Sequence, residues 1–270
     1  MARRPGGEQD RLQDQDIRVI PDDPGAWDFV DAAHVTRYEW AAGSLGEEVI
    51  GSVVDAGCGT GYGVACLARL FPSKRFVGAD YSEAGVALAR RTHASLPNAR
   101  FVVLDLTAAE TLEVARFDAA LSFDVIEHIA DYDRYVDGLD RVLRPGGLLI
   151  CATPNRATRW DYSDVENPYH AHEFTADELA VTLGRRFVVE RVLGQHIVNE
   201  RKRRYHIEQH SRATLPLRDA ARRTLARRLR RRIDRRLLRL HRFKSSDIGF
   251  LPEVGSAFGL VVVARKRDDS

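Results

Sequence analysis

Short apolar segments alternate with helical patterns along most of this chain, and the alternation predicts its architecture. Runs of strand length occur at residues 52–55, 75–79, 101–104, 118–122, 148–152, 187–193 and 258–264. Helical patterns lie between them at residues 64–70, 83–91, 132–143 and 176–183. Because strands and helices at this spacing form βαβ units, we expect an α/β fold with a parallel sheet and helices on both faces.

The ends of several elements have signals of their own. Ser82 and Thr175 occupy N-cap positions before two of the helices, where a side-chain oxygen accepts a hydrogen bond from a backbone N–H. Residues 144–147 (Arg-Pro-Gly-Gly) predict a turn that restarts the chain as a strand. Over residues 26–45 the apolar residues recur at helical spacing, which predicts one or two helices ahead of the first strand.

The length and composition suit one large domain with an insertion. The chain has 270 residues, of which 44% are hydrophobic, and this is enough for a sizeable core. Residues 1–20 are polar and aperiodic, so we expect a disordered tail there. We expect a core with an N-terminal helical cover over residues 21–198, a basic helical insertion over 199–247, and the last strand of the core within 248–270.

Two features bear on the cellular location. No apolar run approaches the roughly 18 residues that a membrane span needs, and no apolar stretch follows the arginines near the N-terminus, so we expect no secretory signal. The three cysteines, Cys58, Cys66 and Cys151, form no C-x-x-C pair. We therefore expect reduced thiols without a metal role and a cytoplasmic protein.

The segment from Val53 to Gly63 is the most informative part of the chain. A strand leads to Asp55, and glycine then occupies positions 57, 59 and 61. A loop without side-chain bulk lets the backbone press against a flat polar ligand while the next helix begins beneath it. The spacing G-x-G-x-x-G fits in no frame and no G-K-[ST] follows, so a dinucleotide fingerprint and a P-loop are both excluded. A chance glycine-rich hairpin is the other interpretation.

Acidic residues stand at the ends of the first three predicted strands, at Asp55, Asp80 and Asp105. In a doubly wound sheet, ligands bind outside the carboxyl ends of the strands. Asp80 lies 23 residues after Gly57, where an acid in related sheets accepts from ribose hydroxyls. Because Asp often ends strands and caps helices, that simpler role accounts for one or two of the three.

The spacing D-x-G-x-G-x-G from Asp55 to Gly61 resembles motif I of the class I S-adenosylmethionine (SAM)-dependent methyltransferases. Residues 123–128 (Phe-Asp-Val-Ile-Glu-His) and 143–147 (Leu-Arg-Pro-Gly-Gly) resemble later motifs of the branch that includes ubiquinone-biosynthesis-like and glycan-modifying enzymes. The resemblance covers about residues 50–155. It implies a Rossmann-like doubly wound sheet of seven strands, with SAM as the cofactor and S-adenosylhomocysteine as its product.

The resemblance also implies a role for each residue at this edge of the sheet. Asp80 would accept from both ribose hydroxyls, and Asp105 beside the backbone N–H of Leu106 would hold the adenine. Phe123 and Asp124 would lie beneath the methionine moiety. The complete set of expected cofactor-binding residues is Tyr38, Asp55, Gly57, Gly59, Gly61, Asp80, Tyr81, Asp105, Leu106, Phe123 and Asp124.

Two stretches outside this core, residues 34–39 and 167–175, resemble bacterial enzymes that methylate sugars of glycans or glycosylated metabolites. In such enzymes the first stretch closes over the methionine end of the cofactor. Arg37 and Tyr38 share a helix face with His34, and either could hold the cofactor carboxylate. The other interpretation is an ordinary surface helix with an anchoring tyrosine.

A methyl transfer to an alcohol needs a group that removes the hydroxyl proton. The candidates that we expect to be catalytic are His128, His170, His172 and Glu173. The two residues of the His-x-His pair lie in a loop rich in titratable groups, which favours a site over decoration. The same pair also suggests a metal, but no further Asp/His cluster stands at ligand spacing in the sequence, so we expect no metal site.

Residues 201–244 contain 18 basic and 3 acidic residues, whereas the rest of the chain is acidic. Apolar residues about four apart predict one amphipathic helix over residues 217–240. The segment suits a lid or homodimer contact, a basic surface for anionic substrates or membrane headgroups, or an RNA-binding arm. RNA is disfavoured, because no aromatic residue interleaves the arginines between Tyr205 and Phe243.

These observations predict a SAM-dependent methyltransferase that acts on a hydroxyl, or less favourably an amine, of a small polar acceptor. The acceptor that we expect is a sugar in a glycan, glycolipid or glycosylated natural product. An RNA methyltransferase that uses the arginine-rich helix is the alternative enzyme. A SAM-binding module without catalysis, which binds a partner through that helix, is the alternative of a different class.

Overall fold

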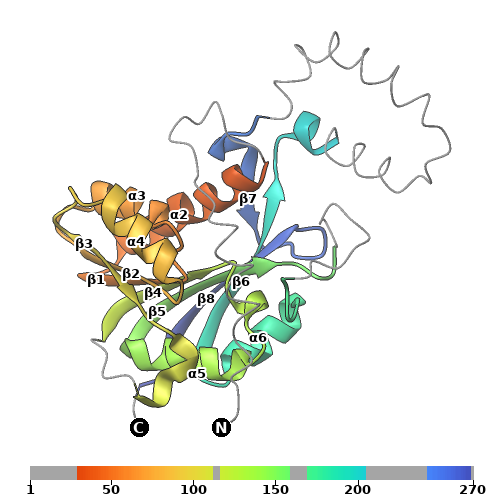
Figure 1. The fold of residues 1–270 in the computed structure, drawn as a ribbon. Coiled ribbons are helices and arrows are strands. Elements are labelled where there is room, and N and C mark those ends of the chain that lie inside the picture. Colours follow the sequence, from red (N-terminus) through yellow and green to blue (C-terminus); the bar gives the residue numbers. More distant parts are fainter. Residues whose placement is uncertain (1–28, 112–115, 159–168, 205–241, 269–270) are drawn as a thin grey trace, which may run out of the picture.

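An eight-stranded sheet forms the centre of the protein (Figure 1), and the computed structural model describes residues 29–111, 116–158, 169–204 and 242–268. The strands are β1 (Ser52–Ala56), β2 (Arg75–Asp80), β3 (Ala99–Val103), β4 (Phe117–Phe123), β5 (Leu143–Pro154), β6 (Phe187–Ile197), β7 (Ile248–Leu251) and β8 (Gly259–Lys266). Their order across the sheet is β3-β2-β1-β4-β5-β8-β6-β7. The chain turns back between β1 and β4, so the topological switch point lies there.

The first five strands run parallel, and their carboxyl ends meet at one edge. Asp55 of β1 lies opposite Gly78 of β2, and Asp80 at the end of β2 lies opposite Val103 at the end of β3. β4 and β5 continue the parallel pairing on the other side of β1. The expected gathering of these strand ends is therefore confirmed.

The other half of the sheet differs from the prediction in two respects. β8 pairs antiparallel with β5 and β6, and β7 pairs antiparallel with β6, so the expectation of a parallel sheet is correct for five strands only. The expected count of seven strands is wrong, because the four-residue β7 is an additional strand. β8 is a continuous buried apolar run, which is the pattern typical of a parallel strand. The sequence therefore did not indicate that β8 runs antiparallel to its neighbours.

The turn predicted at residues 144–147 is also wrong. β5 already begins at Leu143, and its pairing with β4 shifts between Phe117 and Ala119, which places an irregularity within a continuous strand. Gly146 has a φ of 69°, which residues with a side chain rarely adopt. The proline and glycines therefore produce a bend inside the pairing instead of a break between elements.

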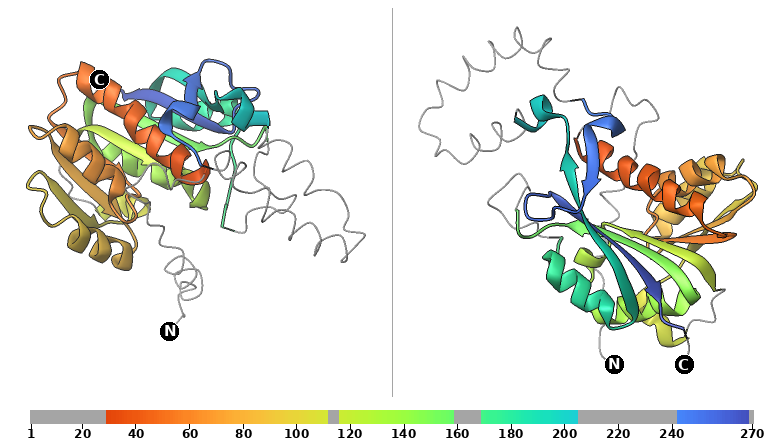
Figure 2. Two further views of the ribbon diagram at one scale, coloured as in Figure 1. Left: turned by 90° about the horizontal axis from the view of Figure 1, so that it is seen from above. Right: turned by 180° about the vertical axis from the view of Figure 1, so that it is seen from behind.

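Helices cover both faces of the sheet (Figures 1 and 2). One layer holds α2 (Phe29–Glu47), α3 (Tyr62–Leu70) and α4 (Glu83–Thr92), and the other holds α5 (Tyr132–Val142) and α6 (Ala176–Gly184). Short 3-10 helices are η2 (Leu106–Thr111), η3 (Ile126–His128) and η4 (Ser245–Asp247). Successive strand residues serve the two layers, because Val53 packs in the cluster under the first and Val54 in the cluster under the second.

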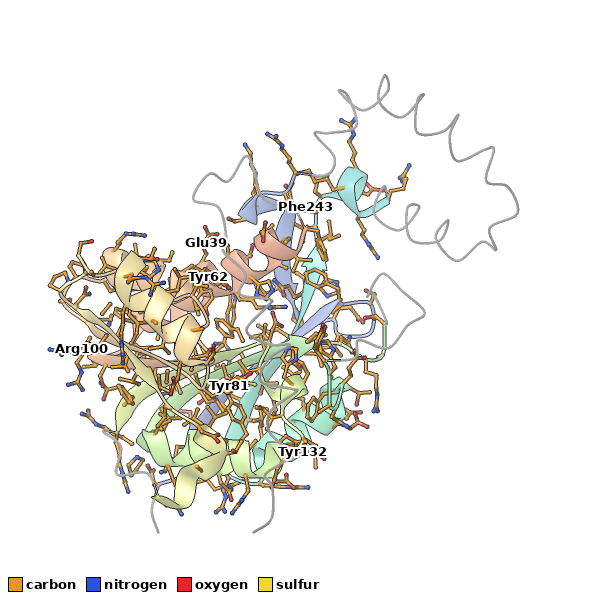
Figure 3. All side chains as sticks on the ribbon, in the orientation of Figure 1. Glu39, Tyr62, Tyr81, Arg100, Tyr132 and Phe243 are labelled. Carbon is orange, nitrogen blue, oxygen red and sulfur yellow. The ribbon has the colours of Figure 1, made fainter. Side chains whose placement is uncertain are left out.

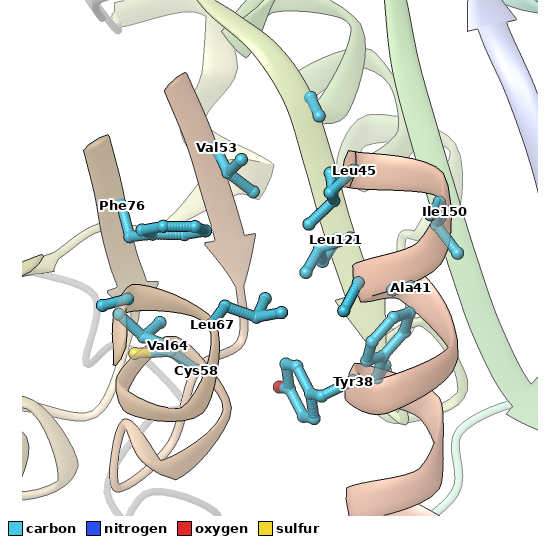
Figure 4. Close-up of a cluster of buried hydrophobic side chains, with 14 of the residues drawn as sticks. Tyr38, Ala41, Leu45, Val53, Cys58, Val64, Leu67, Phe76, Leu121 and Ile150 are labelled. Carbon is cyan, nitrogen blue, oxygen red and sulfur yellow. The ribbon is translucent and has the colours of Figure 1, made fainter. Parts of the chain in front are cut away.

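The first helix of the described chain, α2, is packed as part of the core. Tyr38, Ala41 and Leu45 lie three and four residues apart on one face and are each at most 3% exposed (Figure 4). A Cβ on Gly63 of α3 would lie 2.1 Å from the Tyr38 ring. Glycine at this position therefore lets α3 approach α2 closely, and the helical cover is tied to the glycine-rich segment.

Both predicted N-caps are confirmed. The Ser82 side chain accepts from the backbone N–H of Gly85 at the start of α4. Thr175 accepts from the N–H of Glu178, whose side chain accepts in return from the N–H of Thr175, which completes a capping box at α6. These local signals fix where two of the helices begin.

Two predicted segments lie outside the described residues: the tail at 1–20 and the amphipathic helix at 217–240. The described part of the insertion contains η4 and Phe243, which is labelled in Figure 3. The ring of Phe243 packs edge-to-face on that of Phe29 at 5.3 Å. Within the described ranges, no helix combines the length and apolar character that crossing a membrane requires.

Candidate functional site

The loop between β1 and α3 places three glycines in left-handed backbone conformations. The φ angles are 87° at Gly57, 51° at Gly59 and 78° at Gly61. A Cβ at Gly57 would lie 2.2 Å from Val125, and one at Gly61 would lie 2.5 Å from Phe101. A Cβ at Gly59 would meet no described atom within 4 Å. Packing therefore requires the outer two glycines, and the middle one faces open space over the loop.

Asp80 links the end of β2 to this loop. Its Oδ2 accepts from the backbone N–H of Gly59 at 2.8 Å, and its Oδ1 accepts from the N–H of Ser82 at 2.9 Å. Burial raises the pKa of Asp80, and the hydrogen bonds from the N–H groups of Ser82 and Gly59 oppose the rise. Because a carboxylate offers about four acceptor positions, Asp80 keeps acceptor capacity for a ligand, and its contact with ribose hydroxyls stays a prediction.

The three residues expected around the adenine, Tyr81, Asp105 and Leu106, differ in their exposure to solvent. Asp105 is exposed, and its Oδ1 accepts from both the N–H and the hydroxyl of Thr107 at the start of η2. Leu106 is buried, and the Tyr81 side chain, labelled in Figure 3, is 44% exposed. Asp105 thus performs the capping role that was the simpler interpretation, and the adenine contact of these three residues stays a prediction.

Tyr38 and Asp55 form a buried pair under the loop. The Tyr38 hydroxyl donates to Asp55 Oδ2 at 2.9 Å, and its ring packs edge-to-face on Phe123 at 4.9 Å. The structure therefore uses the hydroxyl of Tyr38 to hold Asp55, and not to face a ligand carboxylate. Among the described residues, Asp55 Oδ1 is a buried oxygen without a hydrogen-bond partner. Such an atom fits a cationic ligand group at the end of β1.

Burial gives Asp55 a pH-dependent cost that can be measured. It raises the pKa from its ordinary 3.8 to about 7. The folded protein therefore keeps a proton that the unfolded chain releases, and stability falls as the pH rises between these values. From about pH 5 to about pH 8 we expect wild type to lose about 3 kcal/mol from this group. In Asp55→Asn, the free energy of unfolding measured in urea should lack this decrease with pH. An equal pH dependence of the free energy of unfolding in the two proteins would contradict the prediction.

Asp124 lies at the centre of an ion-pair network between α2 and β4. It is a non-glycine residue with a positive φ, 53°, which turns its carboxylate toward Arg37 and His34. Arg37 is buried, contacts Asp124 through its Nη1 and donates from Nε to Gln195 at 2.8 Å. Burial raises the pKa of Asp124, but the nearby charges of Arg37 and His34 outweigh this effect and hold the pKa below its usual value. Arg37 is thus engaged by protein groups, and the expected contact with a cofactor carboxylate is untested.

Three of the residues after β4 and β5 come together in a cluster that we call the Glu-His-His cluster: Glu127, His128 and His170. One ligand atom of each lies within 4.8 Å of those of the other two. Glu127 is fully buried, and its Oε2 accepts from the hydroxyl of Thr153 at 2.9 Å. Burial raises the pKa of Glu127 to about 8, and nearby Asp124 adds to the rise. Burial lowers the pKa of His128, which keeps that ring neutral near pH 7.

The loop that carries the remaining histidines is bound to η3 through its backbone. The N–H groups of Ala171 and His172 both donate to the carbonyl of Glu127, at 2.7 and 3.1 Å. The ring of His170 lies 4.9 Å from that of His128. The Nδ1 of His170 lies 2.8 Å from Oε1 of Glu173, which accepts a hydrogen bond from it. The ring of His172 packs 4.5 Å from that of Phe174. The structure thus brings His128, His170 and Glu173 together and turns His172 into aromatic packing.

Two residues of this region were missed by the sequence analysis. Glu127 lies inside the motif at residues 123–128 and has a buried oxygen without a hydrogen-bond partner among the described residues. Gln195 of β6 is fully buried and donates to the carbonyl of Ala33 while it accepts from Arg37. It lies 158 residues from Arg37, so no local pattern could have paired the two.

Comparison with known families agrees with this geometry. Residues 54–151, which run from β1 into β5 and include the glycine-rich loop, match the family model described as a methyltransferase domain. A probable S-adenosylmethionine-dependent methyltransferase of Mycolicibacterium smegmatis is 38% identical over 148 residues, which cover 53% of this chain and 54% of the relative. Residues 54–151 are therefore a methyltransferase domain, and the relative that matches them is described as SAM-dependent.

Other comparisons show how far the methyltransferase likeness extends. A ubiquinone biosynthesis O-methyltransferase of Mesorhizobium japonicum is 39% identical over 111 residues, 40% of this chain and 42% of that protein. The chain therefore spans about half the length of the relatives that it matches. The crystal structure of the N-methyltransferase NodS from Bradyrhizobium japonicum, in complex with S-adenosyl-L-homocysteine, covers 96% of this chain and 99% of NodS with a TM-score of 0.58. At 12% identity this likeness shows the class I methyltransferase fold.

Proposed function

We propose that the protein transfers a methyl group from SAM to a hydroxyl of a small polar acceptor. The observation that carries the proposal is the bond between Asp80 Oδ2 and the N–H of Gly59. This bond joins Asp80, which has spare acceptor positions, to Gly59. Among Gly57, Gly59 and Gly61, Gly59 is the glycine at which an added Cβ would meet no described atom within 4 Å. Together they offer a carboxylate for a ribose and an unobstructed backbone for the flat part of the ligand.

The buried carboxylates suit the charged end of the same cofactor. Asp55 Oδ1 and Asp124 Oδ1 are both buried without a hydrogen-bond partner among the described residues. SAM carries a sulfonium and an ammonium group, and cations of this kind offset the cost of buried carboxylate oxygens. Gly59 and Asp80 would hold the adenosyl part, and Asp55 and Asp124 would face the positive part.

SAM supplies an activated methyl group: its carbon–sulfur bond breaks as the acceptor oxygen bonds to the methyl carbon, S-adenosylhomocysteine is left, and the acceptor loses one proton. The chain must orient the acceptor and lower the cost of removing that proton. The Glu-His-His cluster lies after β4 and β5, next to the parallel strand ends, and we place hydroxyl activation there. We propose a sugar hydroxyl as acceptor, supported by the likeness of residues 34–39 and 167–175 to enzymes that methylate sugars.

Gly59→Ala tests the proposal with little damage to the fold. The added methyl group enters open space, so the cost to stability is the left-handed conformation, about 1–2 kcal/mol. It would also occupy the side from which a ligand approaches the backbone, and we expect the affinity for SAM in titration calorimetry to fall at least about tenfold. The matched control is Gly43→Ala on the exposed face of α2, where a Cβ also meets no described atom within 4 Å.

Activity is tested by mixing wild type with SAM and pools of glycans, glycosides and nucleosides, and measuring S-adenosylhomocysteine. We expect product with the sugar pools. SAM binding without product from any pool would contradict the enzyme and favour a binding module. Unchanged SAM affinity in Gly59→Ala would contradict the cofactor site itself.

A further inference from the structure

We propose that the Glu-His-His cluster binds a divalent transition-metal ion through Glu127, His128 and His170. The inference deepens the proposed function, because the ion would activate the acceptor hydroxyl. It replaces the expectation of no metal site, which rested on spacing along the sequence. Folding brings His170 to Glu127 and His128, so that one ligand atom of each lies within 4.8 Å of the others.

Glu127 provides the first independent observation. The side chain is fully buried, Thr153 satisfies only Oε2, and Oε1 has no hydrogen-bond partner among the described residues. Leaving a buried carboxylate oxygen unpaired is costly, and such a group in a native structure calls for a ligand, water or ion. Protonation would not remove the deficit, because Oε1 would still lack a partner.

The two histidines provide the second observation. The Nδ1 of His128 lies 2.9 Å from the carbonyl oxygen of Tyr169, and the Nδ1 of His170 lies 2.8 Å from a carboxylate oxygen of Glu173. Both partners accept hydrogen bonds, so each Nδ1 is placed to donate, and Nε2 is the nitrogen that can offer a lone pair to an ion. A histidine whose Nδ1–H is held by a carbonyl or carboxylate is the usual arrangement of a metal-binding imidazole.

The donor set indicates the kind of ion. Two imidazoles and one carboxylate suit Zn²⁺, Mn²⁺, Fe²⁺ and related ions, whereas Mg²⁺ and Ca²⁺ favour oxygen ligands. Three protein ligands leave positions open for a bound substrate oxygen. A hydroxyl bound there would lose its proton to water more easily, and the resulting oxygen would attack the methyl carbon of SAM as its bond to sulfur breaks. In this arrangement the two histidines hold the ion and do not act as bases.

Metal binding is measured first and without any acceptor. The full chain is stripped with a chelator, dialysed against Zn²⁺, Mn²⁺ or Mg²⁺, and its metal content is determined by elemental analysis and titration calorimetry. We expect one equivalent of Zn²⁺ or Mn²⁺ and at least about tenfold weaker binding of Mg²⁺. Glu127→Gln and His170→Ala should each lower the affinity at least about a hundredfold.

His172→Ala is the matched control, because His172 lies in the same loop but packs on Phe174. It should keep the wild-type metal affinity, and SAM affinity close to that of wild type shows that each variant is folded. Loss of metal in His172→Ala equal to that in His170→Ala would overturn the assigned ligands. The absence of bound transition metal in wild type would overturn the site.

The two proposals fail in different ways. Methyl transfer at an undiminished rate after the metal is stripped would overturn the role of the ion and leave the methyltransferase proposal intact. A stoichiometric metal site in a protein that binds no SAM would support the site and overturn the proposed reaction. We expect transfer to fall at least about tenfold in stripped enzyme and to return with Zn²⁺ or Mn²⁺.

Discussion

Asp80→Ala is expected to lower the affinity for SAM by a factor of about 10²–10⁴. Each hydrogen bond between a carboxylate and a ribose hydroxyl is worth about 1.5–3 kcal/mol, and two are lost together. The substitution also removes the acceptor that holds the N–H of Gly59, so the loop loses its tie to the end of β2. Titration calorimetry with SAM and S-adenosylhomocysteine measures the change directly.

The control for this experiment is Asp105→Ala. Asp105 is exposed and its Oδ1 is already used by Thr107, so we expect a loss of affinity of about tenfold or less. Asp80→Asn keeps the shape but places amide N–H groups near backbone donors, and it should bind almost as weakly as Asp80→Ala. SAM affinity within about threefold of wild type in Asp80→Ala would rule out the ribose assignment.

Arg37→Met is expected to lower the free energy of unfolding by about 3–5 kcal/mol. The substitution fills a similar volume, but it leaves the carboxylate of Asp124 and the amide oxygen of Gln195 without the buried guanidinium that both contact. Removing one partner of a buried ion pair costs more than the pair itself contributes, because a charge stays behind. Urea unfolding in the absence of ligand measures the loss.

A second substitution separates this electrostatic cost from lost packing. Asn tolerates the left-handed conformation that position 124 requires, and Asp124→Asn removes the charge. The double variant Arg37→Met with Asp124→Asn should therefore be more stable than Arg37→Met. If the two single losses simply added in the double variant, the ion pair would not be the cause.

The parts that could be predicted from the sequence are those with local causes. Ser82 and Thr175 cap their helices through residues three positions away, and such bonds depend on nearby chain only. The glycines at 57, 59 and 61 predicted a tight loop because positive φ angles exclude most side chains. The position of Asp80 beside that loop was predicted because Asp80 ends β2, and the carboxyl ends of neighbouring parallel strands lie at the same edge of the sheet.

The parts that could not be predicted depend on pairing between distant segments. β7 has only four residues and is a strand because it pairs with β6. The direction of β8 depends on where the chain re-enters the sheet between β5 and β6. The acid at position 105 reads in the sequence like the one at position 80, yet its carboxylate caps η2. Spacing along the chain does not indicate the Glu-His-His cluster, because Glu127 and His128 come from η3 and His170 comes from the loop after β5.

By itself, the sequence determined the class of fold and the edge of the sheet at which the glycine-rich loop and Asp80 lie, since strand length, caps and glycine spacing act over a few residues. The tertiary structure decided which charged groups are paired and which buried oxygens are left for a ligand. Arg37 meets Asp124 across 87 residues, and only folding removes the water that would otherwise satisfy both. Burial and long-range pairing, which together turn a list of acids and histidines into a site, are properties of the folded chain.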